Sequence, residues 1–353
     1  DWSVTPRNSR GCDLAQCGYC IYGCRHGGKQ TAGATYLADA QRAGNTRVIA
    51  RCRAAKLMIE NGRVSGVSAT VMHGDGRTSR VTVRADKVIA ACGSIHTAAL
   101  LLRSGVRTPQ VGRNLHIHPT TAVGAVFDHP LEAWSGAPQT VVCNEFANLR
   151  DGYGFRVETA PGHPGLIALA TPWLGARSHR REMQNAAHRA LLIALVRDRS
   201  TGRVSIDRDG RPVIEYSPGR GEIAMLREGI AQTSRILHAA GAKGIQTIHT
   251  RPLGVGECSS ESRSFPDIDA LCAAIAESRV TDNHLGLFSA HQMGTCRMGR
   301  DAASAVCDER GEVFGVRRLY IGDASAFPGS SGVNPMVTIM AMAHHTARRI
   351  VDG

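Results

Sequence analysis

A short apolar segment that ends in glycine and leads into a helical pattern does most to constrain the fold. Residues 87–93 read Lys-Val-Ile-Ala-Ala-Cys-Gly, which predicts a short buried strand, and residues 96–104 have the apolar spacing of a helix. Near the other end of the chain, residues 319–323 predict a strand followed by a turn, and residues 335–351 have a helical pattern. Strands that lead on to helices in this way indicate an α/β protein.

The patterns between these two regions predict mixed structure. Asn61-Gly62 favours a tight hairpin turn because both residues tolerate positive φ angles. His116 and His118 are expected to alternate along a strand and to point the same way. The further predictions are a helix at 33–43, a strand at 48–52, hairpin strands at 56–59 and 63–67 and at 70–72 and 79–83, strands at 121–127, 202–206 and 212–216, and helices at 181–196 and 222–240.

Length and charge limit the classes of protein that fit. A chain of 353 residues is long enough for two domains with a sizeable core. The net charge of +12 comes from scattered basic residues without a run of five or six, which argues against a nucleic-acid partner. An anionic cofactor or a peripheral contact with a membrane surface explains the charge at least as well, and so does genome composition.

The location of the protein is constrained by what the sequence lacks. No apolar run approaches the ~20 residues that a membrane-spanning helix needs. The chain starts at Asp1 without a signal or transit-like segment. Its 11 cysteines are an odd number, which is not typical of a secreted disulfide framework. We therefore expect a reducing compartment, the cytoplasm.

Two stretches near the C-terminus have the composition of a proton-transfer site. Residues 291–299 read His-Gln-Met-Gly-Thr-Cys-Arg-Met-Gly, and Gly322-Asp323-Ala324-Ser325 is followed by Ser-Gly-Val-Asn-Pro-Met at 331–336. An imidazole such as His291, with an ordinary pKa of ~6.5, can accept a hydroxyl proton at physiological pH. Asn334 cannot titrate, so it would orient a substrate oxygen, or it is simply the N-cap of a helix that opens with Pro335.

Four cysteines lie close together near the N-terminus. Cys12, Cys17, Cys20 and Cys24 have the density of an iron–sulfur or zinc site, but their spacing matches neither the common zinc pairs nor the ferredoxin run. Packed or locally bridged thiols are the favoured interpretation, so no metal ligand is assigned.

Several segments together, in this order, point to one family. These segments are residues 87–94 with 100–105, then residues 111–115 with His118-Pro119, and last the two C-terminal stretches described above. The chain resembles the glucose-methanol-choline (GMC) flavoprotein oxidoreductases over essentially its whole length. The Gly-Val-Asn-Pro form is most similar to the branch of long-chain alcohol oxidases and cholesterol oxidases.

The resemblance implies an FAD-dependent oxidase or dehydrogenase. The expected reaction is oxidation of an alcohol CH–OH group to the aldehyde, with hydride transfer to flavin N5 and His291 as the base. An apolar long-chain primary alcohol is the first expected substrate, and a sterol is the second. The implied catalytic residues are His291 and Asn334, and the implied FAD contacts are Gly93, Gly322, Asp323, Ala324, Asn334, Pro335 and Met336.

The implied fold is α/β, with a Rossmann-like FAD-binding domain and an α+β substrate-binding domain. Residues 1–105 would belong to the FAD-binding domain and carry the cysteine-rich segment, 106–280 would bind substrate, and 281–353 would complete the FAD-binding domain and the active site. The FAD-binding domain is expected to be incomplete because its N-terminal βαβ unit is lacking.

One departure from the family pattern is plain. Family members begin with a strand, a Gly-x-Gly-x-x-Gly turn and a helix that hold the flavin pyrophosphate, and no such turn stands near the start of this chain. The chain thus resembles the C-terminal two thirds of a member. We expect it to need a missing N-terminal segment or a second chain to bind FAD tightly. Two alternatives stay open: a metal-binding or iron–sulfur electron-transfer subunit, and an inactive fragment.

Overall fold

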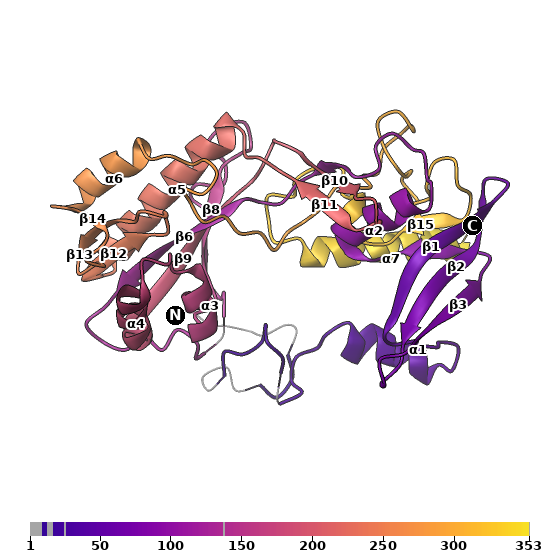
Figure 1. Ribbon diagram of the computed structural model, residues 1–353, viewed down its shortest axis with the longest axis horizontal. Coiled ribbons are helices and arrows are strands. Elements are labelled where there is room, and N and C mark those ends of the chain that lie inside the picture. The colour runs from indigo at the N-terminus through magenta and orange to yellow at the C-terminus, as the bar shows by residue number, and fades with distance from the viewer. Residues whose placement is uncertain (1–8, 13–16, 25, 137, 353) are drawn as a thin grey trace. The chain divides into compact units, whose positions relative to one another are not determined.

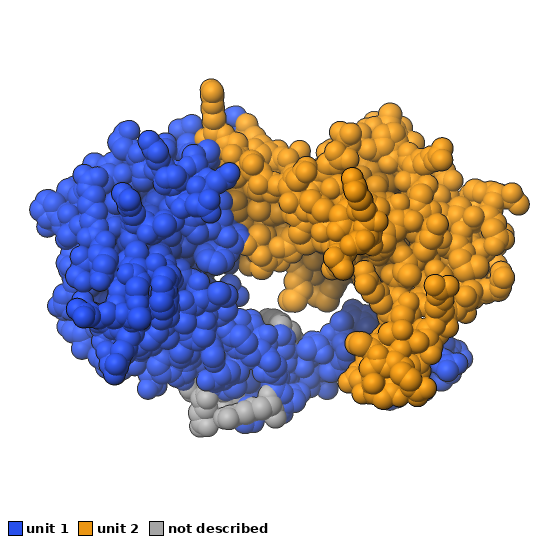
Figure 2. Space-filling model, in the orientation of Figure 1, with its two compact units in different colours: residues 1–47, 120–196, 223–288 blue, residues 48–119, 197–222, 289–353 orange. Residues whose placement is uncertain are grey.

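The computed structural model describes residues 9–12, 17–24, 26–136 and 138–352. The chain forms two compact units, each assembled from separate stretches of sequence (Figure 2). Unit 1 consists of the described part of residues 1–47 with residues 120–196 and 223–288, and unit 2 consists of residues 48–119, 197–222 and the described part of 289–353. None of the described helices is both long and apolar enough to cross a bilayer.

Unit 1 is built on a seven-stranded sheet with the order β14-β13-β12-β6-β9-β8-β7 (Figure 1). Neighbouring strands are antiparallel except β13 and β14, which are parallel. The strands are β6 (Thr120–Val126), β7 (Val142–Cys143), β8 (Phe155–Thr159), β9 (Arg189–Val196), β12 (Gly244–Thr247), β13 (Leu253–Gly256) and β14 (Arg263–Phe265).

Two helices pack against this sheet through one apolar core. Leu226 and Ile230 of α5 (Arg220–Ala239) and Leu271 of α6 (Ile268–Ala276) are fully buried and share a cluster with strand residues such as Phe155 and Ile245. Burial of each such side chain stabilises the fold by ~2 kcal/mol. The other helices of this unit are η1 (Gly33–Leu37), α1 (Ala38–Arg42), α3 (Pro164–Ala170), α4 (Ala176–Gln184) and η2 (Ala186–His188).

Unit 2 combines three small sheets around α2 (Gly93–Arg103). An antiparallel sheet has the order β1-β2-β3, a second has the order β11-β10-β5, and β15 pairs with β4 in parallel. The strands are β1 (Cys52–Glu60), β2 (Arg63–Met72), β3 (Thr78–Arg84), β4 (Val88–Ala90), β5 (Arg113–Leu115), β10 (Gly202–Ile206), β11 (Pro212–Glu215) and β15 (Leu319–Ile321), and the remaining helices are η3 (Ala324–Ala326) and α7 (Met336–Asp352).

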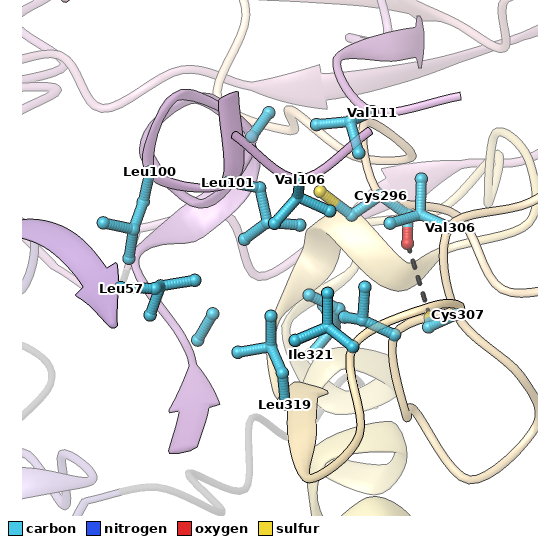
Figure 3. Packing of buried hydrophobic residues seen from close by; sticks show 14 of the residues in the cluster. Leu57, Leu100, Leu101, Val106, Val111, Cys296, Val306, Cys307, Leu319 and Ile321 are labelled. Atoms are coloured by element: carbon cyan, nitrogen blue, oxygen red, sulfur yellow. Dashed lines mark hydrogen bonds between the residues drawn. The ribbon is translucent and has the colours of Figure 1, made fainter. Parts of the chain in front are cut away.

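The core of unit 2 lies between α2, β1, β4 and β15 (Figure 3). Leu101, Leu57 and Leu319 are almost fully buried and belong to one apolar cluster. The Cys307 thiol donates to the Cys296 carbonyl oxygen at 3.5 Å within the same cluster. Burial raises the pKa of the Cys307 thiol to about 12, so this cysteine is a packing residue rather than a nucleophile.

Most elements predicted from the sequence are present, and the α/β fold class is confirmed. Asn61 and Gly62 have φ angles of 50° and 69°, which is the tight turn expected between β1 and β2. The predicted strand at 202–206 coincides with β10, and the predicted helix at 222–240 differs from α5 by two residues at its start and one at its end.

Two element predictions are wrong. The helix predicted at 181–196 is replaced by the end of α4 and by β9, which pairs with β6 on one side and β8 on the other. The run Ala190–Val196 has no period that separates a buried strand from a buried helix, and pairing on both edges decides for the strand. Residues 48–51 lie outside the strand predicted at 48–52, because β1 begins only at Cys52.

Candidate functional site

The segment that carries His291 is fixed to its surroundings by backbone hydrogen bonds. The backbone N–H of Met293 donates to the His116 carbonyl and the N–H of His116 donates to the Met293 carbonyl, at 2.9 Å each. The Gly294 N–H donates to the Ala324 carbonyl at 3.1 Å. Gly294 has a φ of 90°, and a Cβ there would lie 2.4 Å from the Asn114 carbonyl oxygen. Glycine is therefore required at this position for two reasons, the backbone conformation and the close approach.

The first turn of α2 is joined to the same segment and to the turn after β15. The Ser94 hydroxyl donates to the Gln292 carbonyl at 2.7 Å, and the Thr295 hydroxyl donates to the Ser94 carbonyl at 2.5 Å. Asp323 Oδ2 accepts from the Gly93 N–H at 2.9 Å and from the Thr97 hydroxyl at 2.5 Å. These bonds hold together residues that are more than 190 positions apart in the sequence.

Four of the predicted cofactor residues follow the carboxyl ends of the two parallel strands. Gly93 follows β4, and Asp323 and Ala324 follow β15 by way of Gly322, whose N–H donates to Ala90 at 2.9 Å. A Cβ at Gly322 would lie 2.8 Å from the Ile89 side chain, so a larger residue there would force that side chain to move. The carboxyl edge of parallel strands is the usual ligand edge of an α/β sheet.

His291 is in direct contact with a second histidine. The Nδ1 atoms of His118 and His291 lie 3.1 Å apart, and their ring planes meet at 84°. His118 is completely buried, and its φ of 50° is in the left-handed region. The Gly332 N–H donates to His118 Nε2 at 2.9 Å. The site therefore joins the segments around His118, His291 and Gly332, and Asn334 follows two residues after Gly332.

Burial keeps both imidazoles neutral. It lowers the pKa of His118 to about 4, partly opposed by the attraction of the nearby Asp198 carboxylate. Burial also lowers the pKa of His291 below the ordinary histidine value. A neutral imidazole can accept a proton, so His291 has the protonation state that acid–base chemistry at neutral pH requires.

A buried carboxylate supports this histidine cluster, and no sequence pattern predicted it. Asp198 is completely buried. Its Oδ2 accepts from the Ile117 N–H at 2.9 Å and the Tyr216 hydroxyl at 3.1 Å, and its Oδ1 accepts from the Ser330 hydroxyl at 2.7 Å. Burial by itself raises the pKa of Asp198, but the imidazole of His116 and the bonds from Ile117 and Ser330 outweigh it, so the pKa lies below its ordinary value.

The expectation that His116 and His118 alternate on a strand is wrong. β5 ends at Leu115, and the left-handed backbone at His118 turns its ring toward His291, whereas His116 Nδ1 lies 3.6 Å from Asp198. A histidine beside a proline in a short His-x-His-Pro motif was the only signal that could have drawn attention to this pair.

The start of the last helix differs slightly from the prediction. α7 begins at Met336, and the Ile339 N–H donates to the Pro335 carbonyl at 2.8 Å. Pro335 thus occupies the position before the first helical residue, where the sequence predicted Asn334. Met336 is 56% exposed and Val337 is 68% exposed, so the first turn of α7 presents an apolar surface.

The four clustered cysteines lie partly beside residues 13–16, which are outside the described part of the chain. Cys17, Cys20 and Cys24 form no disulfide bond within the described part of the chain, so the locally bridged form is not present among these three. Across residues 9–12, 17–24, 26–136 and 138–352, no three His, Cys, Asp or Glu side chains form a group that could hold a metal ion. The Lys29 N–H donates to the Cys24 sulfur at 3.4 Å and lowers the pKa of that thiol.

Comparison with known proteins gives relatives over nearly all of the chain. A long-chain-alcohol oxidase of Arabidopsis thaliana, FAO4A, is 30% identical over 347 residues, which cover 95% of this chain and 47% of the relative. An uncharacterized GMC-type oxidoreductase of Mycobacterium tuberculosis is 33% identical and covers 98% of this chain and 51% of its own length. The chain thus spans about half the length of these relatives, less than the two thirds expected from its motifs.

Solved structures share the fold. Pyridoxine 4-oxidase from Mesorbium loti superposes with a TM-score of 0.67 at 21% identity, covering 94% of this chain and 63% of that one. Formate oxidase from Aspergillus oryzae superposes with a TM-score of 0.62 at 16% identity, covering 85% of this chain and 59% of that one. Two sequence profiles, both described as GMC oxidoreductase, match residues 1–120 and residues 198–343. The chain belongs to the GMC oxidoreductase family.

Proposed function

We propose that this protein takes part in the FAD-dependent oxidation of an alcohol CH–OH group to the aldehyde. The observation that carries the proposal is the contact between the neutral imidazoles of His291 and His118, fixed near the carboxyl ends of β4 and β15. Family membership and the alcohol oxidases among the relatives support the same reaction.

The residues at this edge fit a flavin nucleotide. Gly93 has a φ of 79°, and a Cβ added there would meet no atom within 4 Å, so the backbone at the start of α2 leaves space for a ligand. The apolar first turn of α7 offers Met336 and the peptide groups beside it. Each oxygen of the Asp323 carboxylate already accepts a hydrogen bond from the chain. Asp323 therefore supports the FAD site chiefly by fixing Gly93, and Gly322 and Ala324 supply backbone contacts.

In the proposed reaction, His291 accepts the proton of the substrate hydroxyl. The chemistry that bound FAD supplies is acceptance of a hydride equivalent from the alcohol carbon. Asn334 donates its amide to the substrate oxygen and holds it against His291. The N-terminal end of α7, with Pro335 and Met336, adds a partial positive charge that favours anionic groups beside it.

We further propose a long-chain primary alcohol as substrate, with a sterol as the second candidate. The resemblance to the long-chain alcohol oxidases supports this choice. We also propose that residues 106–280 bind the substrate. A peripheral contact of the protein with a membrane surface is part of the same proposal.

Replacement of His291 tests this function directly. In the FAD-loaded protein, His291→Ala should slow flavin reduction by an alcohol roughly 10²–10⁴-fold, the usual effect of a lost general base. Alcohol binding should change much less. His73→Ala, on the exposed hairpin between β2 and β3, is the matched control and should keep the parental rate.

Equal rates of flavin reduction in His291→Ala and the parent would remove His291 from the mechanism. The visible spectrum of the purified protein separates the other interpretations. Stoichiometric iron with acid-labile sulfide, lost in Cys17→Ser or Cys20→Ser, would favour an electron-transfer subunit in place of an alcohol oxidase.

A further inference from the structure

The direction of one hydrogen bond fixes the proton on His118. The donor at Gly332 is a backbone N–H, which can only donate, so His118 Nε2 must be the acceptor at 2.9 Å. A ring nitrogen that accepts a hydrogen bond carries no proton. Neutral His118 therefore carries its single proton on Nδ1.

The same reasoning extends to the neighbouring imidazole. His118 Nδ1 lies 3.1 Å from His291 Nδ1, and only one of two nitrogens in such a contact can carry the shared proton. Because His118 Nδ1 is the donor, His291 Nδ1 is the acceptor. Neutral His291 then carries its proton on Nε2, the ring nitrogen that does not face His118.

We infer that His118 is a positioning residue that decides which nitrogen of His291 carries the proton. The consequence for catalysis rests on the proposed function. With the hydrogen bond from Gly332 in place, the free nitrogen of His291 is a donor, so it can hold a substrate oxygen but cannot take a proton. His291 becomes a base only when the proton of His118 moves to Nε2, which requires the Gly332 N–H to turn away.

The protons balance in this exchange. His118 Nδ1 passes its proton to His291 Nδ1 across the 3.1 Å contact, His291 Nε2 gives its proton to a water molecule, and His118 Nε2 takes a proton from water once the Gly332 N–H has turned away. His291 Nδ1–H then donates to His118 Nδ1, and His291 Nε2 is free to accept the hydroxyl proton. The resulting imidazolium keeps its hydrogen bond to His118, which stabilises the charge.

The loop that carries Gly332 is suited to a local change of this kind. Gly332 has a φ of 66°, a conformation that glycine leaves and re-enters at little cost. Ser330 is held separately, because its hydroxyl donates to Asp198 and its carbonyl accepts from Arg197 Nε at 3.2 Å. A turn of the peptide at Gly332 therefore leaves the Asp198 anchor intact.

The proton positions can be measured by ¹⁵N NMR on the complete chain labelled at histidine, with His291 assigned through His291→Gln. The expected spectrum at neutral pH shows His118 protonated on Nδ1 and His291 protonated on Nε2. His118→Phe keeps a ring at this position without an N–H, so neutral His291 should lose its fixed tautomer and show its proton shared between Nδ1 and Nε2. His116→Phe, which alters the neighbouring histidine, should leave the proton on His291 Nε2.

A parent spectrum with the proton on His118 Nε2 or on His291 Nδ1 would overturn the inference. This result does not depend on a variant, so it stands even where His118→Phe fails to fold. It is also separate from the proposed function, because the NMR experiment uses neither substrate nor turnover. Unchanged flavin reduction in His291→Ala would reject the base role and leave the measured proton positions as they are.

Discussion

Asp198 connects several segments around the histidine pair. Its two oxygens accept three hydrogen bonds, from a backbone N–H before His118, from Tyr216 and from Ser330 in the loop that leads to Gly332. A buried charge is tolerated only when such donors satisfy it. The carboxylate thus joins three segments that carry or support the candidate site.

Removal of this carboxylate should cost stability. Asp198→Ala leaves three donors without their acceptor, two of them hydroxyls, and we expect the free energy of unfolding to fall by ~3 kcal/mol at pH 7. Urea unfolding measures the loss. Asp209→Ala removes an exposed carboxylate near the β10–β11 turn and should change stability by less than ~0.5 kcal/mol. Equal losses in the two variants would contradict the role of Asp198.

The effect of pH on this residue has a definite sign. The pKa of Asp198 is lower in the folded protein than the ordinary value of ~4. Its contribution is therefore fully present above that ordinary value and is lost as pH falls through the lower folded value. The difference between Asp198→Ala and the parent should be constant from pH 8 to about pH 5 and should shrink below pH 4.

The sequence identified only part of this site, for a physical reason. His291 could be selected because it stands beside glycines in a recognisable motif, of which Gly294 needs its positive φ and lacks room for a Cβ. Asp198 and Ile117 are 81 residues apart, and the contact between His118 and His291 spans 173 residues. Only the packing of unit 2 brings these groups together, so no local pattern could predict them.

Among the elements, hairpins were predictable and the central strand β9 was not. The turn at Asn61-Gly62 is decided by its own backbone conformation, which the residue types specify locally. β9 is decided by its partners β6 and β8, which lie elsewhere in the sequence. The same difference between local and distant causes applies to α7. Its helical pattern was clear from the sequence, but its first residue depends on the loop before it.

The junction between α2 and β15 gives a prediction at this scale. Asp323 accepts from Gly93, Thr97 and Ser325, so Asp323→Ala should lower the free energy of unfolding by ~3 kcal/mol. Thr97→Val removes the donor to Asp323 and the acceptor of the Cys92 N–H, and it should lower the free energy of unfolding by ~2 kcal/mol. Hydrogen exchange of the backbone amides in residues 93–97 should be faster in Thr97→Val than in the parent, and faster still in Asp323→Ala. Asp86→Ala, at an exposed ion pair with Arg63, is the control and should alter neither quantity. Faster exchange throughout unit 2 without a local excess at 93–97 would contradict this role of Asp323.

At the scale of the whole molecule, each unit contains a buried histidine that must stay neutral. His118 lies in unit 2 and His249 in unit 1, and burial lowers the pKa of each to about 4. His249 Nδ1 lies 2.8 Å from the Thr247 hydroxyl within the core of its unit. Neither histidine is paired with a carboxylate strongly enough to reverse the cost of burying its charge.

Both units should therefore lose stability in mild acid. Between the unfolded pKa of ~6.5 and the folded value of about 4, the unfolded chain binds a proton that the folded chain does not, so stability falls as pH decreases. From pH 7 to pH 5 each histidine should lower the free energy of unfolding of its unit by ~2 kcal/mol.

Peptide-resolved hydrogen exchange can follow the units separately, and fluorescence of Trp134 and Trp173 reports on unit 1. His249→Phe should abolish most of the acid loss in unit 1 and leave that of unit 2 unchanged. An unchanged acid loss in unit 1 of His249→Phe would show that carboxylates, which titrate at lower pH, dominate instead.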